Sequence, residues 1–462
     1  MTHPSINDEL LTSKLEKLSS GPAIERLRAR IRGGEDRQLF RINPYAFAAE
    51  EGVEPTQAIE LLLRASVFGL FRTDWSLMCR GCGEYVVTHG GLRDLESMVH
   101  CLSCARDREP NLEETVEVAF TVDPEIRAIR FEKPETLDLA DYFYNYKFSS
   151  NIHVRGEGRS LIDHLRLGEK ALVRLGPGES HTFETNVDVG WIVGSPRMMI
   201  TIEGEPTTEV RELDLSFDGL AFTPRPKVAP GPIRVRLRNG TTESVPVLSY
   251  FTAVVTYFDY SPFLSGQRLL NTNDFRRHVR TEVVRPGSAI ATGSNTLLFS
   301  DLRGSTALYD RIGDKAAFEL VSAHLELLAR VVTRHSGIVV KTIGDAVMAS
   351  FSRPVDAVRG AIEMNELVKG IAADEPLVLK IGIHRGPCLV VNVREDIDYF
   401  GQTVNIAARV QSAAKSGEIC MTEAIFDDPA VRALFPDPKN IPSESMALRG
   451  VGSPYLVYRF EP

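Results

Sequence analysis

Long apolar runs are absent from this sequence. No stretch reaches the ~18 uninterrupted apolar residues that a helix needs to cross a bilayer. The first residues, MTHPSINDELLTSKLEK, are polar and mixed in charge, and they lack the apolar core of a secretory signal. The sequence therefore predicts a protein of the cytoplasm with no membrane segment.

Positive charge is also scarce. The chain has 53 Lys and Arg against 62 Asp and Glu, which gives a formal net charge of −9. A protein that coats nucleic acid needs a basic face for the phosphates, so we do not expect nucleic acid as a partner. Binding of one nucleotide through a few local cations stays open.

No Ser-His-Asp or Cys-His set stands out among the dispersed histidines, so no side-chain nucleophile is expected.

Cysteine is rare as well, with six residues in the chain. Four of them form two C-x2-C pairs separated by 18 residues. Each pair turns two thiolates toward one point, and two pairs complete a tetrahedron around Zn²⁺. The spacing predicts a closed structural site with one Zn²⁺ per chain, although a redox pair or unrelated cysteines are the alternatives. The expected ligands are Cys79, Cys82, Cys101 and Cys104, while Cys388 and Cys420 are expected in the core.

The front of the chain reads as a helical module followed by a zinc ribbon. Residues 1–75 show apolar residues at helical spacing, most clearly from Ala58 to Leu70. Helix, turn, helix and strand in that order resemble a winged-helix module. Residues 76–110 hold the paired cysteines and have room for a β-hairpin between them.

The rest of the chain changes character twice. Residues 111–261 alternate apolar and polar positions between Gly/Pro turns, which predicts an all-β domain of the sandwich type. Residues 262–294 are polar and rich in turn residues, as in a connector. From there, residues 295–462 alternate strands and helices, including a long helix at residues 314–335 with Phe318 and Val321 on its buried face.

The first motif of this last part is TLLFSDLRGST, residues 296–306. An apolar strand delivers Asp301 to its tip, and a turn with Gly304 leads into a helix-like run. A carboxylate beside a turn with outward N–H groups suits a metal-bound polyphosphate. Gly304, Ser305 and Thr306 are therefore the expected phosphate contacts, although many strand ends carry Asp.

The second motif is GIVVKTIGDAVMASF, residues 337–351. Two strand-like runs flank a turn at Gly344 and Asp345, and a hairpin there would place Asp345 opposite Asp301. Two carboxylates at one point can hold two Mg²⁺ or Mn²⁺ ions. An ordinary hairpin with an Asp in its turn is the alternative.

The third motif is DYFGQTVNIAARV, residues 398–410. Asn405 and Arg409 are four residues apart, so they share one face if the segment is helical. An amphipathic helix with a polar stripe is the simpler reading.

In this order, the three motifs resemble the catalytic domain of class III nucleotidyl cyclases over about residues 295–460. The resemblance implies an α+β sandwich related to the ferredoxin-like fold. The whole chain is then a multidomain α+β protein whose helical and zinc-ribbon module and all-β domain precede the cyclase domain. The resemblance also implies a head-to-tail homodimer through the cyclase domain, with each catalytic centre built from two subunits.

The same resemblance implies a role for each motif residue. Lys341 and Asp398 correspond to the pair that reads adenine, which favours ATP over GTP because guanine would present an acceptor to the carboxylate. Asn405 would position the ribose, and Arg409 would neutralise charge on the α-phosphate. Arg449 stands where the family often has a phosphate-binding lysine.

The sequence as a whole thus predicts an adenylyl cyclase, a phosphorus–oxygen lyase that makes cyclic AMP from ATP with two Mg²⁺ or Mn²⁺ ions per site. Its N-terminal region is expected to sense an unidentified effector and to regulate the enzyme. A guanylyl cyclase, or a signalling scaffold with an inactive cyclase domain, are the alternatives. One departure from the family is the run RGPCLVVNVREDID, which has no glycine between Gly386 and Gly401.

Overall fold

The computed structural model describes residues 6–18, 21–96, 98–156, 158–253, 257–278, 289–371, 377–393, 396–448 and 452–462, except for the side chains of residues 305–308. The chain forms two compact units. The first comprises residues 1–90, 95–110 and 115–264, and the second comprises residues 91–94, 111–114 and 265–462. The finer five-part division stays a prediction. Every helix in the described ranges is too short or too polar to cross a lipid bilayer.

The first unit begins with the helices α1 (Asp8–Leu15), α2 (Pro22–Gly33), α3 (Pro44–Glu51) and α4 (Pro55–Val67) and the 3-10 helix η1 (Asp36–Leu39). A proline in the first turn starts three of the four α-helices, where its missing N–H costs no hydrogen bond. The side chain of Asn43 caps α3 through Tyr45 N, and Gly52 ends that helix in the left-handed conformation at φ 64°.

Three strands, in the order β2-β1-β5, form a sheet beside these helices. They are β1 (Phe71–Met78), β2 (Tyr85–His89) and β5 (Val116–Val122). The fully buried strand β5 pairs with β1 from Phe71 to Leu77. Strands β3 (Val99–Cys101) and β4 (Arg106–Arg108) form a small hairpin, preceded by η2 (Leu92–Asp94).

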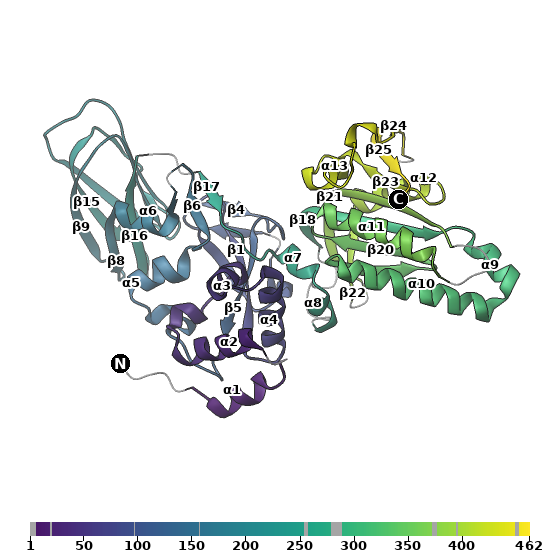
Figure 1. The fold of residues 1–462 in the computed structure, drawn as a ribbon. Coiled ribbons are helices and arrows are strands. Elements are labelled where there is room, and N and C mark those ends of the chain that lie inside the picture. Colours follow the sequence, from purple (N-terminus) through teal and green to yellow (C-terminus); the bar gives the residue numbers. More distant parts are fainter. Residues whose placement is uncertain are drawn as a thin grey trace. The chain divides into compact units, whose positions relative to one another are not determined.

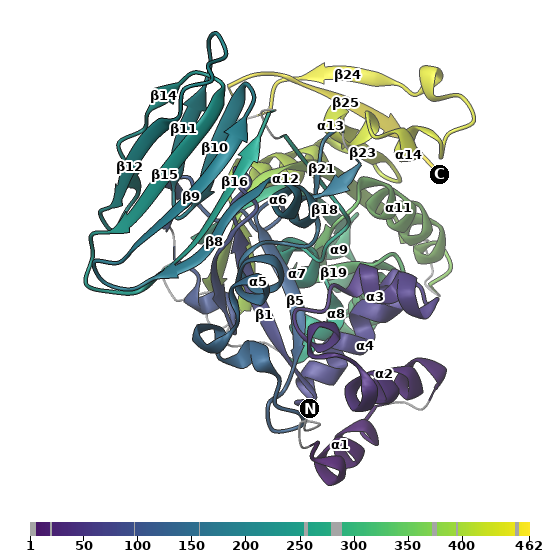
Figure 2. The same ribbon diagram turned by 90° about the vertical axis from the view of Figure 1, so that its left-hand side faces the viewer.

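Two sheets in the middle of the chain pack face to face, as Figure 2 shows for the blue and teal strands. The five-stranded sheet has the order β14-β11-β10-β16-β8, and the four-stranded sheet has the order β13-β12-β15-β9. Both sheets contribute alternate apolar residues to one core, which confirms the predicted all-β region. The bounds are β8 (Glu169–Leu175), β9 (Ser180–Val187), β10 (Gly190–Ser195), β11 (Met198–Ile202), β12 (Arg211–Phe217), β13 (Phe222–Thr223), β14 (Lys227–Val228), β15 (Gly231–Asn239) and β16 (Val245–Thr252).

A smaller layer completes the first unit. Strands β6 (Ile152–Val154), β7 (Arg159–Ser160) and β17 (Phe258–Tyr260) form a sheet next to α6 (Leu161–Gly168). The segment before it contains η3 (Arg130–Glu132), η4 (Pro134–Thr136), α5 (Leu139–Asp141) and the π-helix η5 (Tyr142–Lys147). Aromatic residues of η5, such as Phe143 and Tyr144, pack with α6 in a second core.

The second unit is built on one large sheet with the order β19-β20-β18-β21-β23-β25-β24, and β22 pairs with β21. Its long strands β18 (Ala289–Leu302) and β21 (Leu379–Val393) are antiparallel neighbours. The other strands are β19 (Gly337–Ile343), β20 (Ala346–Phe351), β22 (Asp396–Phe400), β23 (Ile419–Thr422), β24 (Ser443–Met446) and β25 (Tyr455–Phe460).

Helices cover both faces of this sheet. Helices α10 (Asp314–Arg334) and α11 (Pro354–Val368) lie together on one face, as Figure 1 shows. Helix α12 (Gln402–Ala413) packs on the other face, because Cys420 contacts α12 while its neighbours Ile419 and Met421 join the core under α10 and α11. The shorter helices are α7 (Gly266–Leu270), α8 (Asn273–His278), α9 (Ser305–Ile312), α13 (Glu423–Phe426), α14 (Pro429–Arg432) and η6 (Pro438–Asn440).

The buried face of α10 differs from the prediction at one position. Phe318 is 65% exposed, so its expected place in the core is wrong. The buried stripe runs through Ala317, Val321, His324 and Leu328, and Phe318 lies one residue beyond it, about 100° around the helix.

A buried polar network ties the segment before β18 to the sheet. Asn271, which follows α7, accepts hydrogen bonds from Ser350 Oγ at 3.0 Å and from Tyr399 Oη at 2.8 Å. Its amide nitrogen donates to Asn295 Oδ1 at 3.2 Å, and Arg276 of α8 donates to the carbonyl of Ile397 at 3.1 Å. Helices α7 and α8 are therefore hydrogen-bonded to the sheet of the second unit and belong to that unit.

Candidate active site

Two aspartates come together at one end of the large sheet. Asp301 lies near the end of β18, and Asp345 lies in the turn between β19 and β20. Burial raises the pKa of Asp301 first, and the nearby carboxylate of Asp345 raises it further. Lys380, opposite Asp301 in the β18–β21 pair, and a hydrogen bond from Gln411 act in the other direction. Two carboxylates that repel each other in this way form a negatively charged site that a bound cation would neutralise.

A glycine and a histidine stabilise the turn that carries Asp345. Gly344 has a φ of 64°, which favours glycine, and His324 Nε2 lies 3.3 Å from the carbonyl oxygen of Asp345. Burial lowers the pKa of His324, so this histidine stays neutral. The Oδ2 atom of Asp345 is buried and has no hydrogen-bond partner within the described residues. An orphaned carboxylate oxygen beside a second carboxylate suits a hard divalent cation such as Mg²⁺ or Mn²⁺.

Lys341 and Asp398 form an ion pair. Lys341 Nζ of β19 lies 2.6 Å from Asp398 Oδ2 of β22. The other carboxylate oxygen, Asp398 Oδ1, accepts from the backbone N–H of Tyr399 at 2.8 Å. The pair offers one cationic donor and one acceptor side by side, from strands that are far apart in the sequence.

Asn405 and Arg409 are one turn apart on α12. Asn405 is exposed and Arg409 is partly exposed. In the described part of the chain, neither side chain has a hydrogen bond or an ion pair, so both are free to contact a ligand.

The phosphate contacts expected from the sequence are only partly described. Gly304 has a φ of 72° and is the N-cap residue of α9, which accords with a turn that needs glycine. The side chains of Ser305 and Thr306 lie outside the described residues, as does Arg449 altogether.

Three residues near the aspartates were not found from the sequence. Lys380 and a hydrogen bond from Gln411 counteract the rise in the pKa of Asp301. The ring of His324 lies at hydrogen-bond distance from the backbone carbonyl of Asp345. Antiparallel pairing of β18 with β21 is the signal that would have found Lys380, since it places that residue opposite Asp301. No local pattern points to Gln411 or His324. His384 is structural, because it is buried against Thr422 and its pKa falls to about 4 through burial.

The four paired cysteines form a separate cluster in the first unit. Their sulfur atoms all lie within 4.8 Å of one another. The Cys79–Cys104 and Cys82–Cys101 sulfur pairs are 3.7 Å and 3.6 Å apart. Two ligands 2.3 Å from a tetrahedral zinc would be about 3.8 Å apart, so the cluster has the size of a Zn²⁺ site.

The pKa values of the thiols in this cluster are shifted in opposite directions. Hydrogen bonds with Cys101, Cys104 and Cys82 lower the pKa of Cys79, and Arg108 Nε lies 3.2 Å from the Cys79 sulfur. Hydrogen bonds within the cluster raise the pKa of Cys82. The pKa of Cys104 is lowered as well, and the guanidinium of Arg108 beside the cluster favours thiolates, the form in which cysteine binds a metal.

Comparison with known proteins gives two family matches. Residues 6–277 match the family described as "Family of unknown function (DUF5939)". Residues 289–428 match the family described as "Adenylate and Guanylate cyclase catalytic domain". The second match contains both aspartates, the Lys341–Asp398 pair, Asn405 and Arg409.

The chain spans less than a quarter of the length of two curated adenylate cyclases that it matches. The receptor-type adenylate cyclase GRESAG 4.1 of Trypanosoma brucei brucei is 28% identical over 208 residues, which cover 36% of this chain and 16% of that protein. Putative adenylate cyclase 3 of Rhizobium meliloti (strain 1021) is 30% identical over 135 residues, which cover 28% of this chain and 22% of that protein. Among solved structures, the adenylyl cyclase CyaB from P. aeruginosa is similar with 25% identity and a TM-score of 0.33, over 37% of this chain and 95% of that one.

The two family matches do not overlap, and the first spans more than half of the chain. The second match contains the three motifs and the strands from β18 to β23 of the large sheet. The chain therefore belongs to the DUF5939 family, whose function is unknown, and carries after that region the catalytic domain of a class III nucleotidyl cyclase.

Proposed function

We propose that the chain is an adenylyl cyclase, which converts ATP to 3′,5′-cyclic AMP and pyrophosphate. The observation that carries the choice of ATP is the Lys341–Asp398 pair, with 2.6 Å between Nζ and Oδ2. Lysine donates to a ring nitrogen of adenine, and the carboxylate accepts from the exocyclic amine. Guanine places a carbonyl oxygen where adenine has that amine, and two facing acceptors are costly.

The proposed metal ligands are Asp301 and Asp345, with the polyphosphate beside the Gly304 turn and Ser305, Thr306 and Arg449 as further phosphate contacts. Divalent cations bound there would acidify the ribose 3′-hydroxyl and neutralise charge on the phosphates. The 3′-oxygen then attacks the α-phosphorus, the bond to the β-phosphate breaks, and pyrophosphate leaves. The chain contributes position and charge rather than a nucleophile.

Asn405 and Arg409 act on the reacting centre in this proposal. Asn405 orients the ribose, and Arg409 neutralises the charge that builds on the α-phosphate in the transition state. Their lack of partners in the described residues supports this role, because a ligand can engage both without breaking an existing contact.

We propose that the enzyme acts as a homodimer, so that residues of two subunits complete each site. Exposed apolar side chains support such an interface. Ile343 precedes the turn of Asp345, and Phe400, which pairs with Leu389 across β22 and β21, lies two residues after Asp398. Exposed apolar residues grouped beside functional residues mark a surface that a partner covers.

The experiment that tests the choice of nucleotide compares ATP and GTP as substrates of the full chain with Mg²⁺ or Mn²⁺. The wild-type protein should prefer ATP, and Asp398→Asn should lower kcat/KM for ATP about 10- to 100-fold, because an amide can present a donor as well as an acceptor. Asp396→Asn, an exposed position on the same strand, is the matched control. A wild-type preference for GTP would refute the proposal in favour of a guanylyl cyclase.

We further propose that the four-cysteine cluster holds one structural Zn²⁺, since a four-thiolate site leaves no open position for a substrate.

The N-terminal region would regulate the cyclase through an effector. A fragment of residues 265–462 whose rate and dimerisation match those of the full chain under all conditions would refute that role.

A further inference from the structure

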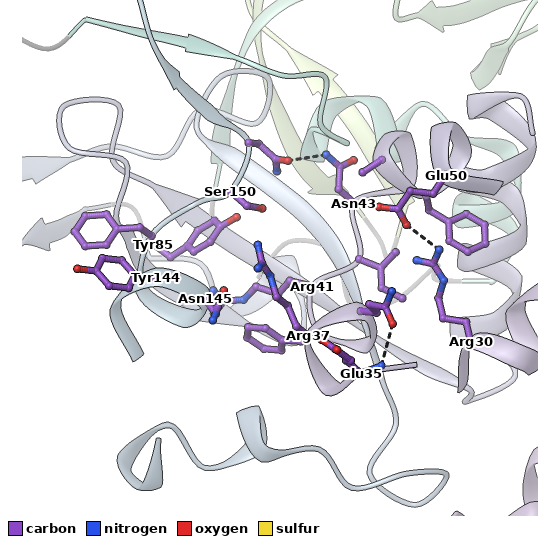
Figure 3. Close-up of a pocket in the computed structure, with 17 residues that line it drawn as sticks. Arg30, Glu35, Arg37, Arg41, Asn43, Glu50, Tyr85, Tyr144, Asn145 and Ser150 are labelled. Atoms are coloured by element: carbon purple, nitrogen blue, oxygen red, sulfur yellow. Dashed lines mark hydrogen bonds and ion pairs between the residues drawn. The ribbon is translucent and has the colours of Figure 1, made fainter. Parts of the chain in front are cut away.

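The first unit contains a cavity of about 370 Å³ that the cyclase reaction does not use. It is lined from α2, η1, α3, β2 and the segment from η5 to β6 (Figure 3). This volume lies at the small-ligand end of the ~300–1,000 Å³ that binding pockets usually enclose.

The charges of the lining do not cancel. Three arginines and two glutamates line the cavity; Glu50 pairs with Arg30 at 2.8 Å, and Glu35 closes the capping box of η1 with Gln38 through hydrogen bonds rather than an ion pair. Arg37 is exposed, and in the described ranges its side chain has no hydrogen bond or ion pair. Arg41 has no ion-pair partner there either. The lining therefore has one net positive charge, and Arg37 and Arg41 are its two arginines without an ion pair within the described residues.

The guanidinium of Arg41 is held in a fixed place. It lies 4.5 Å from the ring centre of Tyr85, 4.8 Å from that of Phe40 and 4.9 Å from that of Tyr146. It donates to the carbonyl of Tyr146 at 2.7 Å and to Thr88 Oγ1 at 3.0 Å. The backbone of Arg41 has a φ of 46°, a region that non-glycine residues avoid unless their surroundings enforce it.

Two buried carboxyls interact with Arg41. Burial raises the pKa of Asp74 and of Glu117 above the ordinary value, and Arg41 counteracts part of that rise. Neither side chain lines the cavity.

Two amide side chains of the lining, Asn43 and Asn151, are held by hydrogen bonds. Asn43 Nδ2 donates to Asn151 Oδ1 at 2.9 Å, and Asn151 Nδ2 donates to the buried Glu117 at 2.7 Å. Tyr85 donates to the same carboxyl at 3.0 Å. Asn145 Oδ1 and Arg41 Nε are buried, and neither atom has a hydrogen-bond partner among the described residues.

Figure 3 shows Tyr85, Tyr144 and Asn145 on one side of the cavity and the Arg30–Glu50 pair on the other, with Arg37 and Arg41 between them. Guanidinium groups suit phosphate oxygens, aromatic faces suit a flat base, and amides suit the donors and acceptors of a base edge. We propose that this cavity is a binding site for a mononucleotide, with the phosphate at Arg37 and Arg41.

The test is calorimetric titration of AMP and GMP into the full chain carrying Lys341→Ala, which disables base recognition in the cyclase domain. At least one of the two nucleotides should still bind. In that background, Arg37→Ala and the isosteric Gln38→Glu, which adds a negative charge to the lining, should each weaken binding about tenfold. Arg32→Ala removes the same charge from α2 outside the lining and should change nothing. The nucleoside of the nucleotide that binds, adenosine or guanosine, lacks the phosphate and should bind at least tenfold more weakly and be insensitive to Arg37→Ala.

Two results would overturn the proposal. One is the absence of AMP and GMP binding in the Lys341→Ala protein, which would confine nucleotide binding to the cyclase domain. The other is nucleotide binding that Arg37→Ala and Gln38→Glu leave unchanged. Because binding is the readout, these results do not depend on whether the cyclase is active or prefers ATP.

Discussion

The two sets of candidate metal ligands differ in how complete they are. The cluster in the first unit has four sulfur atoms within 4.8 Å of one another, enough to surround a tetrahedral ion. The aspartates of the second unit offer two carboxylates, and the Oδ2 atom of Asp345 has no hydrogen-bond partner in the described part of the chain. A complete set stabilises a fold, whereas an incomplete set leaves coordination positions for a substrate. The difference predicts opposite consequences for the same kind of substitution.

The largest expected effect is on activity at the incomplete set. Asp301→Asn or Asp345→Asn should lower cyclase activity on the order of 10³-fold, because charge on the phosphates is no longer neutralised. The unfolding temperature should stay the same or rise, since two repelling carboxylates become one. Product formation and thermal unfolding, measured together, check both halves of this prediction.

Asp310→Asn, at an exposed position of α9, is the control for the loss of one negative charge. A variant of Asp301 or Asp345 that keeps full activity would remove these residues from the metal site.

The second effect is on stability at the complete set. Cys79→Ser or Cys101→Ser should remove bound zinc, which atomic spectroscopy can count, and lower the unfolding temperature of the first unit on the order of 10 °C. The buried thiols Cys388 and Cys420 serve as controls, because neither belongs to the cluster and their replacement should leave the zinc content unchanged. Full-length protein purified without zinc yet equally stable would contradict a structural role.

The smallest effect is a shift in pH dependence. The pKa of Asp301 is raised, so its ionised form is lost at a higher pH than for an ordinary Asp, and activity should fall on the acid side accordingly. Gln411 counteracts this rise through its hydrogen bond, so Gln411→Ala should move the acid limb of the rate profile to higher pH. Gln402→Ala, exposed on the same helix, should leave the profile in place. A downward shift would show that Gln411 does not stabilise the carboxylate.

The sequence predicted features that depend on spacing along the chain. The cysteine cluster follows from two short turns, and the approach of Asp345 to Asp301 follows from a hairpin beside a neighbouring strand. The all-β region followed from alternation, which reports one buried face. The exposed Phe318 was missed because a single position at the edge of a helical stripe cannot be assigned without the neighbouring elements.

Other features depend on contacts between distant segments, and no local pattern reveals them. The cavity of the first unit joins residues from Arg30 to Asn151, and among the described residues the side chain of Arg37 has no hydrogen bond or ion pair. Likewise, Gln411 is one polar residue among several on α12 until the fold places it against Asp301.

The hydrogen bonds of Asn271 determine how the enzyme can be dissected by truncation. A fragment that starts at residue 289, where β18 begins, loses Asn271 and Arg276 and exposes their partners Asn295, Ser350 and Tyr399. Tyr399 adjoins Asp398, so low activity of such a fragment would reflect a damaged nucleotide site rather than a missing regulator. A cut before Ser265 keeps this network and separates the two explanations.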